Sequence, residues 1–282
     1  MKNRISILFL IAAFSTNFSQ ILAQGDPLLN NIIKIVSPVE ISDVIKTAGI
    51  QYNREILNNP QNIYQTEFKQ ALNLGVYSTD LGYANINEQS KDALMYLTSV
   101  KKTADKLNLG DFIDVNKILG LAANKNNLNK LLEETSVTFE NMSTYLQEQQ
   151  KSNLAALIMV GGWLEILHIT CQVAQQQPDN KEITSRIVEQ KLILGQLLQV
   201  LENYQSDPNV ANLTKDLSNL NTLFDKYNFD TNSSITTKEE TIGGVEILVA
   251  EDTNISADIK LSLEELLKIS KVVHDIRSVI IR

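Results

Sequence analysis

The sequence predicts an all-α protein, and three observations support this prediction. Glycine and proline, which interrupt helices, are few, with 11 Gly and 5 Pro in 282 residues. Over long stretches, apolar residues recur at the three- and four-residue spacings that place side chains on one face of an α-helix. The segments between these stretches are short and contain turn residues. Long amphipathic helices with short connections are typical of an antiparallel bundle or of stacked helical hairpins.

The chain begins with the layout of a secretory signal peptide. Lys2 and Arg4 form a short basic region, an apolar run follows, and Ala23 offers a small residue for cleavage. The apolar run is shorter than the roughly 20 residues that span a bilayer. We therefore expect residues 1–23 to be a signal peptide and 24–282 to be a single helical domain, exported to the periplasm or the outside, with no transmembrane span left after cleavage. An uncleaved N-terminal anchor is the alternative.

Composition limits the kinds of partner. The formal net charge is −8, and it becomes −10 once the two basic residues of the signal peptide are removed. A chain with this negative charge is repelled by nucleic acid and by anionic lipid surfaces. We therefore expect neither of them as a partner. Cys171 is the sole cysteine, which excludes an internal disulfide. The fold must therefore be stabilised by its own hydrophobic core.

The apolar periodicity predicts a series of long helices. The breaks between several of them have turn chemistry, with Asn-Leu-Gly at 108–110, Gln-Pro-Asp-Asn at 177–180 and Ser-Asp-Pro-Asn at 206–209. Two shorter helices are expected earlier in the chain, one after Ser37-Pro38 and one over 51–57. The predicted long helices cover residues 61–84, 88–108, 112–123, 126–150, 152–176, 180–205, 209–227 and 257–281.

Residues 231–253 interrupt the helical pattern. A polar run at 231–234 and a β-branched run at 241–249, which contains Gly243-Gly244, predict a small loop or β-hairpin inserted before the last helix. The last helix then has an apolar face that is expected to be buried, made of Ile259, Leu263, Leu266, Leu267, Val273, Ile276 and Ile280.

Segment 152–176 is predicted to be the central helix of the core. Residues 154–164 are apolar apart from Gly161 and Gly162, so this part of the helix has no face suited to water. Glycine inside a helix costs roughly 1 kcal/mol relative to alanine. Such glycines usually allow a second helix to approach closely, and a gap that faces a ligand is the alternative. Trp163, beside them, is expected to be a core anchor.

Glu165 and His168 lie three positions apart on this helix and therefore share a face. Ferritin-like di-metal bundles use this spacing, but they need a second such pair, and the other histidine, His274, has Lys271 at the matching position. We therefore expect a structural polar contact, no metal site and no cofactor. Cys171 lies one turn beyond His168, but a buried free cysteine is commoner than a nucleophile at such a place.

A second unusual segment runs from Gly75 to Ala84 and contains Tyr77, Asp80 and Tyr83. Asp80 shares one helical face with Tyr77 and another with Tyr83. A carboxylate among apolar neighbours must be hydrogen-bonded or paired, or its pKa rises until it is neutral. A tyrosine hydroxyl, a lysine or an arginine from a facing helix would supply the partner. Two interpretations remain open, a structural buried polar network and an acid in a functional pocket.

Two stretches resemble known proteins, namely Gly75-Val-Tyr-Ser-Thr-Asp80-Leu-Gly-Tyr83-Ala and Gly161-Gly-Trp-Leu-Glu165. They are similar to segments of uncharacterised exported all-helical proteins of Bacteroidetes-type bacteria. The resemblance extends over most of the chain after the signal peptide. It implies a bacterial periplasmic or surface setting, and it implies no particular activity.

The sequence contains none of the common catalytic motifs: no P-loop, Gly-x-Gly-x-x-Gly, His-Glu-x-x-His, Gly-x-Ser-x-Gly or Cys-x-x-Cys. We therefore predict a non-enzymatic exported protein that binds a protein or a small molecule, and we assign no catalytic residue. The alternative is an enzyme with a pocket formed by Asp80, Glu165 and His168. Convergence in an open cleft would favour the enzyme, and burial would favour the binding protein. The whole candidate pocket or buried network comprises Tyr77, Asp80, Tyr83, Trp163, Glu165 and His168.

Overall fold

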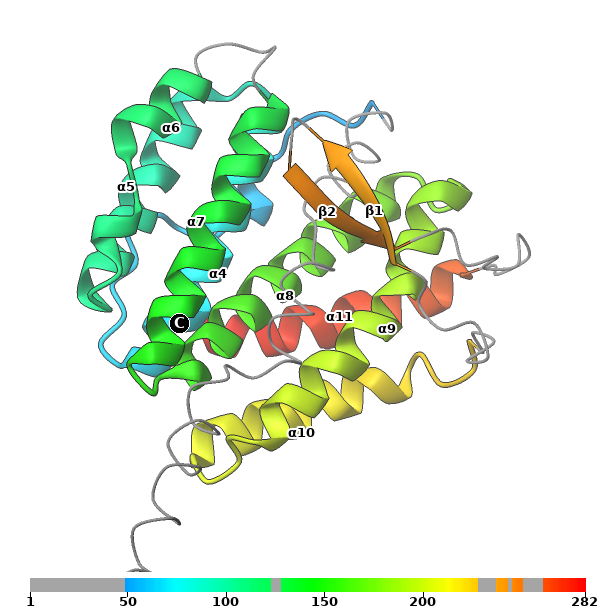
Figure 1. The fold of residues 1–282 in the computed structure, drawn as a ribbon. Helices are drawn as coiled ribbons and strands as arrows, with labels where there is room; N and C mark the ends of the chain where they lie inside the picture. Colours follow the sequence, from blue (N-terminus) through cyan, green and yellow to red (C-terminus); the bar gives the residue numbers. More distant parts are fainter. Residues whose placement is uncertain (1–48, 123–127, 228–236, 243–244, 251–260) are drawn as a thin grey trace, which may run out of the picture.

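The computed structural model of the chain describes residues 49–122, 128–227, 237–242, 245–250 and 261–282. The fold is all-α (Figure 1), and each predicted long helix is present with ends that differ by up to six residues. The helix predicted after Ser37-Pro38 lies outside the described residues. The helices are α4 (Glu67–Ile86), α5 (Ser90–Lys106), α6 (Val115–Ala122), α7 (Leu128–Glu148), α8 (Ser152–Gln176), α9 (Lys181–Glu202), α10 (Pro208–Thr222) and α11 (Leu263–Ile280).

Residues in the predicted breaks cap the helices that follow. Asn180 caps α9, and its side-chain oxygen accepts from two main-chain amides of the first turn. Asp207 caps α10 in the same way, with Pro208 as the first helical residue. Ser262 and Glu265 form a capping box at the start of α11. These side chains satisfy amides that have no partner inside the helix, and this fixes where each helix begins.

The prediction of a helix over 51–57 is wrong. This segment forms a single 3-10 turn, η1 (Arg54–Ile56). The residues that flank η1 have extended backbones. A second turn follows, in which the Asn62 amide donates to the Asn59 carbonyl at 3.1 Å. Residues 52–64, called the strap below, therefore cross the helices as an extended segment with two tight turns.

Helix α8 is the central helix of the core, as predicted. Its side chains are buried on every face, and its most extensive contact is with α4. Figure 1 shows α8 and α11 in the middle of the molecule, with α5 to α7 on one side and α9 and α10 on the other. Among the described helices, α8 alone is long and apolar enough to cross a membrane, but 89% of its most apolar stretch is buried inside the fold. This burial is the pattern of a core helix.

Glycines bring α4 and α8 into direct backbone contact. A Cβ atom at Gly75 would lie 2.0 Å from the Ile158 carbonyl oxygen, and one at Gly161 would lie 1.9 Å from a main-chain oxygen of α4. No side-chain carbon fits at these distances. Across the same crossing, the Thr79 hydroxyl donates to the Gly162 carbonyl at 3.2 Å. The packing role predicted for the glycine pair is confirmed at Gly161, whereas a Cβ at Gly162 would lie 3.5 Å or more from its neighbours.

Two antiparallel strands, β1 (Thr237–Ile242) and β2 (Val245–Ala250), lie within 231–253, where the sequence predicts a loop or a hairpin. Their pairing places Thr237 opposite Ala250 and Ile242 opposite Val245. Residues 243–244, which contain the predicted Gly-Gly turn, lie outside the described residues. The strands form a two-stranded ribbon, so they leave the all-α class of the fold unchanged.

The buried face of α11 is narrower than the sequence predicts. Leu263 and Leu267 were expected in the core, but they are 49% and 48% exposed. Helix α11 packs mainly against α8 and α10, and these two neighbours cover less of its circumference than the predicted face spans. Ile259 lies outside the described residues. The predicted core positions that are buried are Leu266, Val273, Ile276 and Ile280.

Candidate functional site

Most residues of the predicted pocket lie beside the strap. Trp163 is the exception, because its indole Nε1 donates to Gln190 Oε1 of α9 at 3.0 Å. Trp163 is thus the core anchor that the sequence predicts, but it is not part of the site. The residues that gather around the strap, all of them buried, are Tyr77, Asp80, Tyr83, Glu165 and His168.

An arginine outside the predicted set completes the site. Arg277 of α11 donates from Nε to Glu165 Oε2 at 2.5 Å and from Nη2 to Glu165 Oε1 at 2.6 Å. This paired contact matches the planar guanidinium to both oxygens of the carboxylate. The two side chains are only 6% and 0% exposed. A charge so deeply buried needs a partner, and each of these two charges provides one for the other.

The sequence does contain a signal for Arg277. It lies four positions after Val273 and three before Ile280, and both of these are buried on the same helix. A charged residue within a row of core residues indicates a buried ion pair. Periodicity cannot identify the partner, because Glu165 is 112 positions away in the chain.

Asp80 is a buried acid in this site whose pKa is raised. Its Oδ2 accepts from the Asn58 amide at 3.2 Å, and no N–H or O–H group among the described residues reaches its Oδ1. The neighbouring carboxyl group is that of Glu165, and two carboxyl groups close together favour a proton on one of them. Burial, together with the charge of Glu165, raises the pKa of Asp80 well above its usual range. Asp80 is thus the side chain of this site whose charged form the surroundings disfavour, whereas Glu165 is paired with Arg277.

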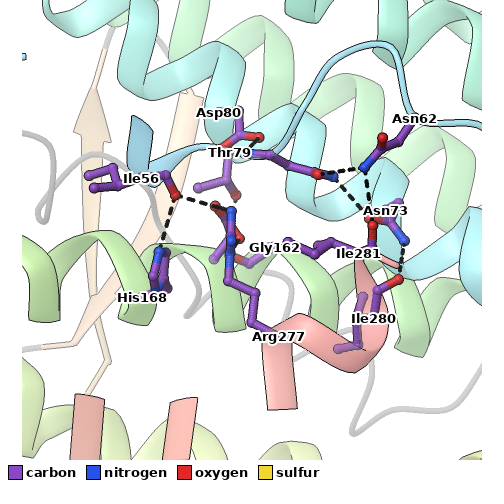
Figure 2. Close-up of polar contacts among 12 residues, drawn as sticks. Ile56, Asn62, Asn73, Thr79, Asp80, Gly162, His168, Arg277, Ile280 and Ile281 are labelled. Carbon is purple, nitrogen blue, oxygen red and sulfur yellow. Dashed lines mark hydrogen bonds and ion pairs between the residues drawn. The ribbon is translucent and has the colours of Figure 1, made fainter. Parts of the chain in front are cut away.

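His168 is neutral, and its tautomer is fixed by the strap. Its Nε2 lies 3.1 Å from the Ile56 carbonyl oxygen, which only accepts, so Nε2 carries the proton. Arg277 Nη2 donates to the same carbonyl at 3.2 Å, and Figure 2 shows both contacts. Burial lowers the pKa of His168 to about 4, against a smaller opposing effect of Glu165. Its Nδ1 is buried without a hydrogen-bond partner among the described residues.

Side chains of α4 and α5 also bind main-chain carbonyls of the strap. Burial raises the pKa of Tyr77 and of Tyr96, so their hydroxyls remain protonated donors. The Tyr83 ring stacks on Tyr52 of the strap, with ring centroids 5.3 Å apart. The contacts, donor first, are Tyr77 to Asn59 (2.9 Å), Tyr96 to Asn58 (2.9 Å), Ser99 to Pro60 (2.7 Å), and Gln70 and Lys106 to Tyr64 (2.9 and 3.2 Å).

The strap is also bound to the end of the chain. Asn62 Nδ2 and the Tyr64 hydroxyl both donate to the Ile281 carbonyl, at 3.1 and 3.2 Å. Asn73 of α4 donates to the Ile280 carbonyl at 3.0 Å, and Figure 2 shows Asn62 and Asn73 beside these two carbonyls. The strap, α4 and the chain terminus therefore form one hydrogen-bonded group.

Reactive groups at the site are withdrawn from solvent. Burial raises the pKa of Cys171 to about 12, so this side chain is an uncharged thiol and a poor nucleophile. In the part of the chain that the structure describes, no three His, Cys, Asp or Glu side chains are grouped to hold a metal ion.

Comparison with protein-family models, curated proteins and solved structures finds no match. The function is therefore argued from the geometry.

Proposed function

We propose that this protein is an exported, non-enzymatic binding protein in which Asp80, Glu165, His168 and Arg277, the polar cluster, are structural. One observation carries the proposal: these side chains converge, yet each is at most 5% exposed. Their polar atoms are hydrogen-bonded mainly to one another and to the main chain of the strap. General acid–base catalysis needs a group within hydrogen-bond reach of a substrate proton, and this burial denies that access.

Export is supported by the basic and apolar pattern of residues 1–23, and the resemblance to exported bacterial proteins suggests a periplasmic or surface location. The partner is a protein or a small molecule, because the net charge of −8 disfavours nucleic acid and anionic lipid. Mass spectrometry of protein from an exporting host is expected to find an N-terminus near Gln24. Intact Met1 on cytoplasmic protein would contradict export.

The competing function is an enzyme that uses Asp80, Glu165 and His168, and it requires solvent to reach the cluster. Diethyl pyrocarbonate tests this access, because it modifies neutral imidazoles that are exposed. The chain has 2 histidines, the buried His168 and the exposed His274, whose ring centroids are 6.2 Å apart. Each is thus a control for the other in the same sample.

We expect His274 to react rapidly at neutral pH and His168 to react only after urea unfolds the protein. Peptide mass spectrometry quantifies the two modifications separately. Similar rates for both histidines in the native protein would show an open site, and the enzyme would then be the better proposal.

A further inference from the structure

The strap is bound as a peptide is bound in a groove, mainly through its main chain. Side chains from four helices, α4, α5, α8 and α11, donate to its carbonyl groups. Most of these donors are themselves buried, so their hydrogen bonds are protected from competition with water. The carbonyls bound by these helices are those of Ile56, Asn58, Asn59, Pro60, Asn62 and Tyr64.

Few side chains of the strap enter the helical body. Leu57, Asn58 and Tyr64 are buried at 8%, 2% and 4% exposure, whereas Glu55 and Gln61 are exposed. Asn58 is the most specific anchor, because its Nδ2 donates to Asn73 Oδ1 at 3.2 Å and to the Tyr64 hydroxyl at 2.9 Å. The surface therefore selects a Leu-Asn pair and a tyrosine six positions after the asparagine. It tolerates other side chains between these anchors.

The closest helix packing in the core does not involve the strap. Helices α4 and α8 meet directly at Gly75 and Gly161, where backbone approaches backbone. The strap instead covers the polar edge of this pair, where Asp80 and His168 lie. It is thus a layer over the crossing of these two helices, bound by directional hydrogen bonds and by the burial of Leu57 and Tyr64 in the same core.

We propose that the surface formed by α4, α5, α8 and α11 is a binding site for an extended peptide, that the strap is its resident ligand, and that a second copy of the strap supplied as a separate peptide can replace it. This proposal extends the binding role proposed above by naming the kind of ligand. The two proposals can fail independently, because histidine modification tests solvent access whereas peptide replacement tests separability.

The test uses the full chain with a protease recognition sequence inserted between the exposed residues Gln65 and Thr66, then cleaved. The cleaved N-terminal part is expected to remain with the helical part on size-exclusion chromatography, with the helical circular dichroism unchanged. Loss of the helical signal on cleavage would overturn the proposal, because the strap would then be an inseparable part of the core.

Replacement is measured by unfolding the cleaved protein in urea and refolding it with a tenfold excess of a fluorescent peptide of residues 50–65. By mass action the peptide should occupy about nine-tenths of the sites. A peptide with Asn58→Ala should be incorporated at least about tenfold less, because it leaves buried hydrogen-bonding groups unpaired. A peptide with Gln61→Ala, an exposed position, is the matched control and should match the unaltered peptide. Absence of incorporation, or equal incorporation of the Asn58→Ala peptide, would overturn the proposal.

Discussion

Arg277 in the last helix binds both carboxylate oxygens of Glu165 in the central helix, and its Nη2 also donates to the Ile56 carbonyl of the strap. One side chain thus joins three segments, and Ile56 and Arg277 are 221 positions apart in the chain. Glu165 is fully buried, so loss of the guanidinium would leave its charge unpaired and would remove one of the two donors to the Ile56 carbonyl. The stability of the fold should therefore be unusually sensitive to this residue.

Replacement of Arg277 by methionine is expected to lower the free energy of unfolding by about 3–5 kcal/mol, because Glu165 would remain buried as an unpaired charge. Urea denaturation followed by circular dichroism measures the change. The double variant Arg277→Met with Glu165→Met should recover a large part of the loss, since both charges are then removed.

The control for this variant is Lys271→Met on the same helix. Lys271 pairs with Asp275 at 2.6 Å, but both side chains are largely exposed, so the pair is screened by water. Little change in stability is expected. A loss as large as that of Arg277→Met would show that α11 responds to any lost cation, and the buried pair would then have no special role.

Asp80→Asn is expected to make the protein more stable at neutral pH. The asparagine side-chain oxygen can still accept from the Asn58 amide, and the side chain has no charged form for burial to disfavour. In the wild type the raised pKa of Asp80 means that the unfolded chain, with a pKa near 3.8, releases a proton that the folded chain retains. The wild type should therefore lose stability relative to the variant as the pH rises above about 4.

Urea denaturation of both proteins between pH 4 and pH 8 measures this difference. Asp80→Ala is the control: it also removes the titrating group but loses the hydrogen bond to the Asn58 amide, so it should be less stable than Asp80→Asn at every pH. A stability difference between wild type and Asp80→Asn that is independent of pH would show that Asp80 is ionised in the folded protein.

His168 is expected to destabilise the fold in acid. Its pKa is about 4 when folded and 6.5 as a free group, so the unfolded chain binds a proton first as the pH falls. Stability should decrease from pH 6.5 to about 4 and then level off, by a total of roughly 3 kcal/mol at about 1.4 kcal/mol per pH unit. The charged groups that face His168 are Glu165 on its own helix and Arg277 on α11, with His274 beside it.

In His168→Gln this decrease should disappear, because the glutamine amide does not titrate but can still donate to the Ile56 carbonyl. At each pH the free energy of unfolding of the wild type is subtracted from that of the variant. This difference cancels the opposite contribution of Asp80, which both proteins share. If the variant retained the full acid slope, protonation of another group would have to explain it.

The sequence predicts the helices well because their signals are local. Apolar spacing and the caps at Asn180 and Asp207 act within a few residues. The prediction of a helix over 51–57 was wrong because the structure of this segment depends on distant residues. The carbonyls of Ile56 and Asn58 are bound by side chains of helices far away in the chain. The predicted burial of Leu267 was wrong because the width of the buried face of a helix depends on how many helices surround it.

The candidate site could be predicted in part. Asp80, Glu165 and His168 stand out because polar groups within apolar helices need partners. Their convergence on the strap has no signal in the sequence, because a main-chain carbonyl such as that of Ile56 can belong to any residue type. Arg277 was detectable as a charge on an apolar face, but its pairing with Glu165 is a contact between helices that periodicity does not encode.

Substitution of glycine by alanine should have opposite effects at two positions of α4. At Gly75 the added Cβ would lie 2.0 Å from the Ile158 carbonyl oxygen, so α4 and α8 would have to separate, and we expect a loss of about 1–3 kcal/mol from overpacking. At Gly82 no atom lies within 4 Å of the added Cβ, and the higher helix propensity of alanine should stabilise the fold by about 1 kcal/mol. Urea midpoints of the two variants against the wild type measure both effects. If Gly75→Ala were as stable as Gly82→Ala, the close crossing of α4 and α8 would not be a feature of the folded protein, and the core would have to be packed in another way.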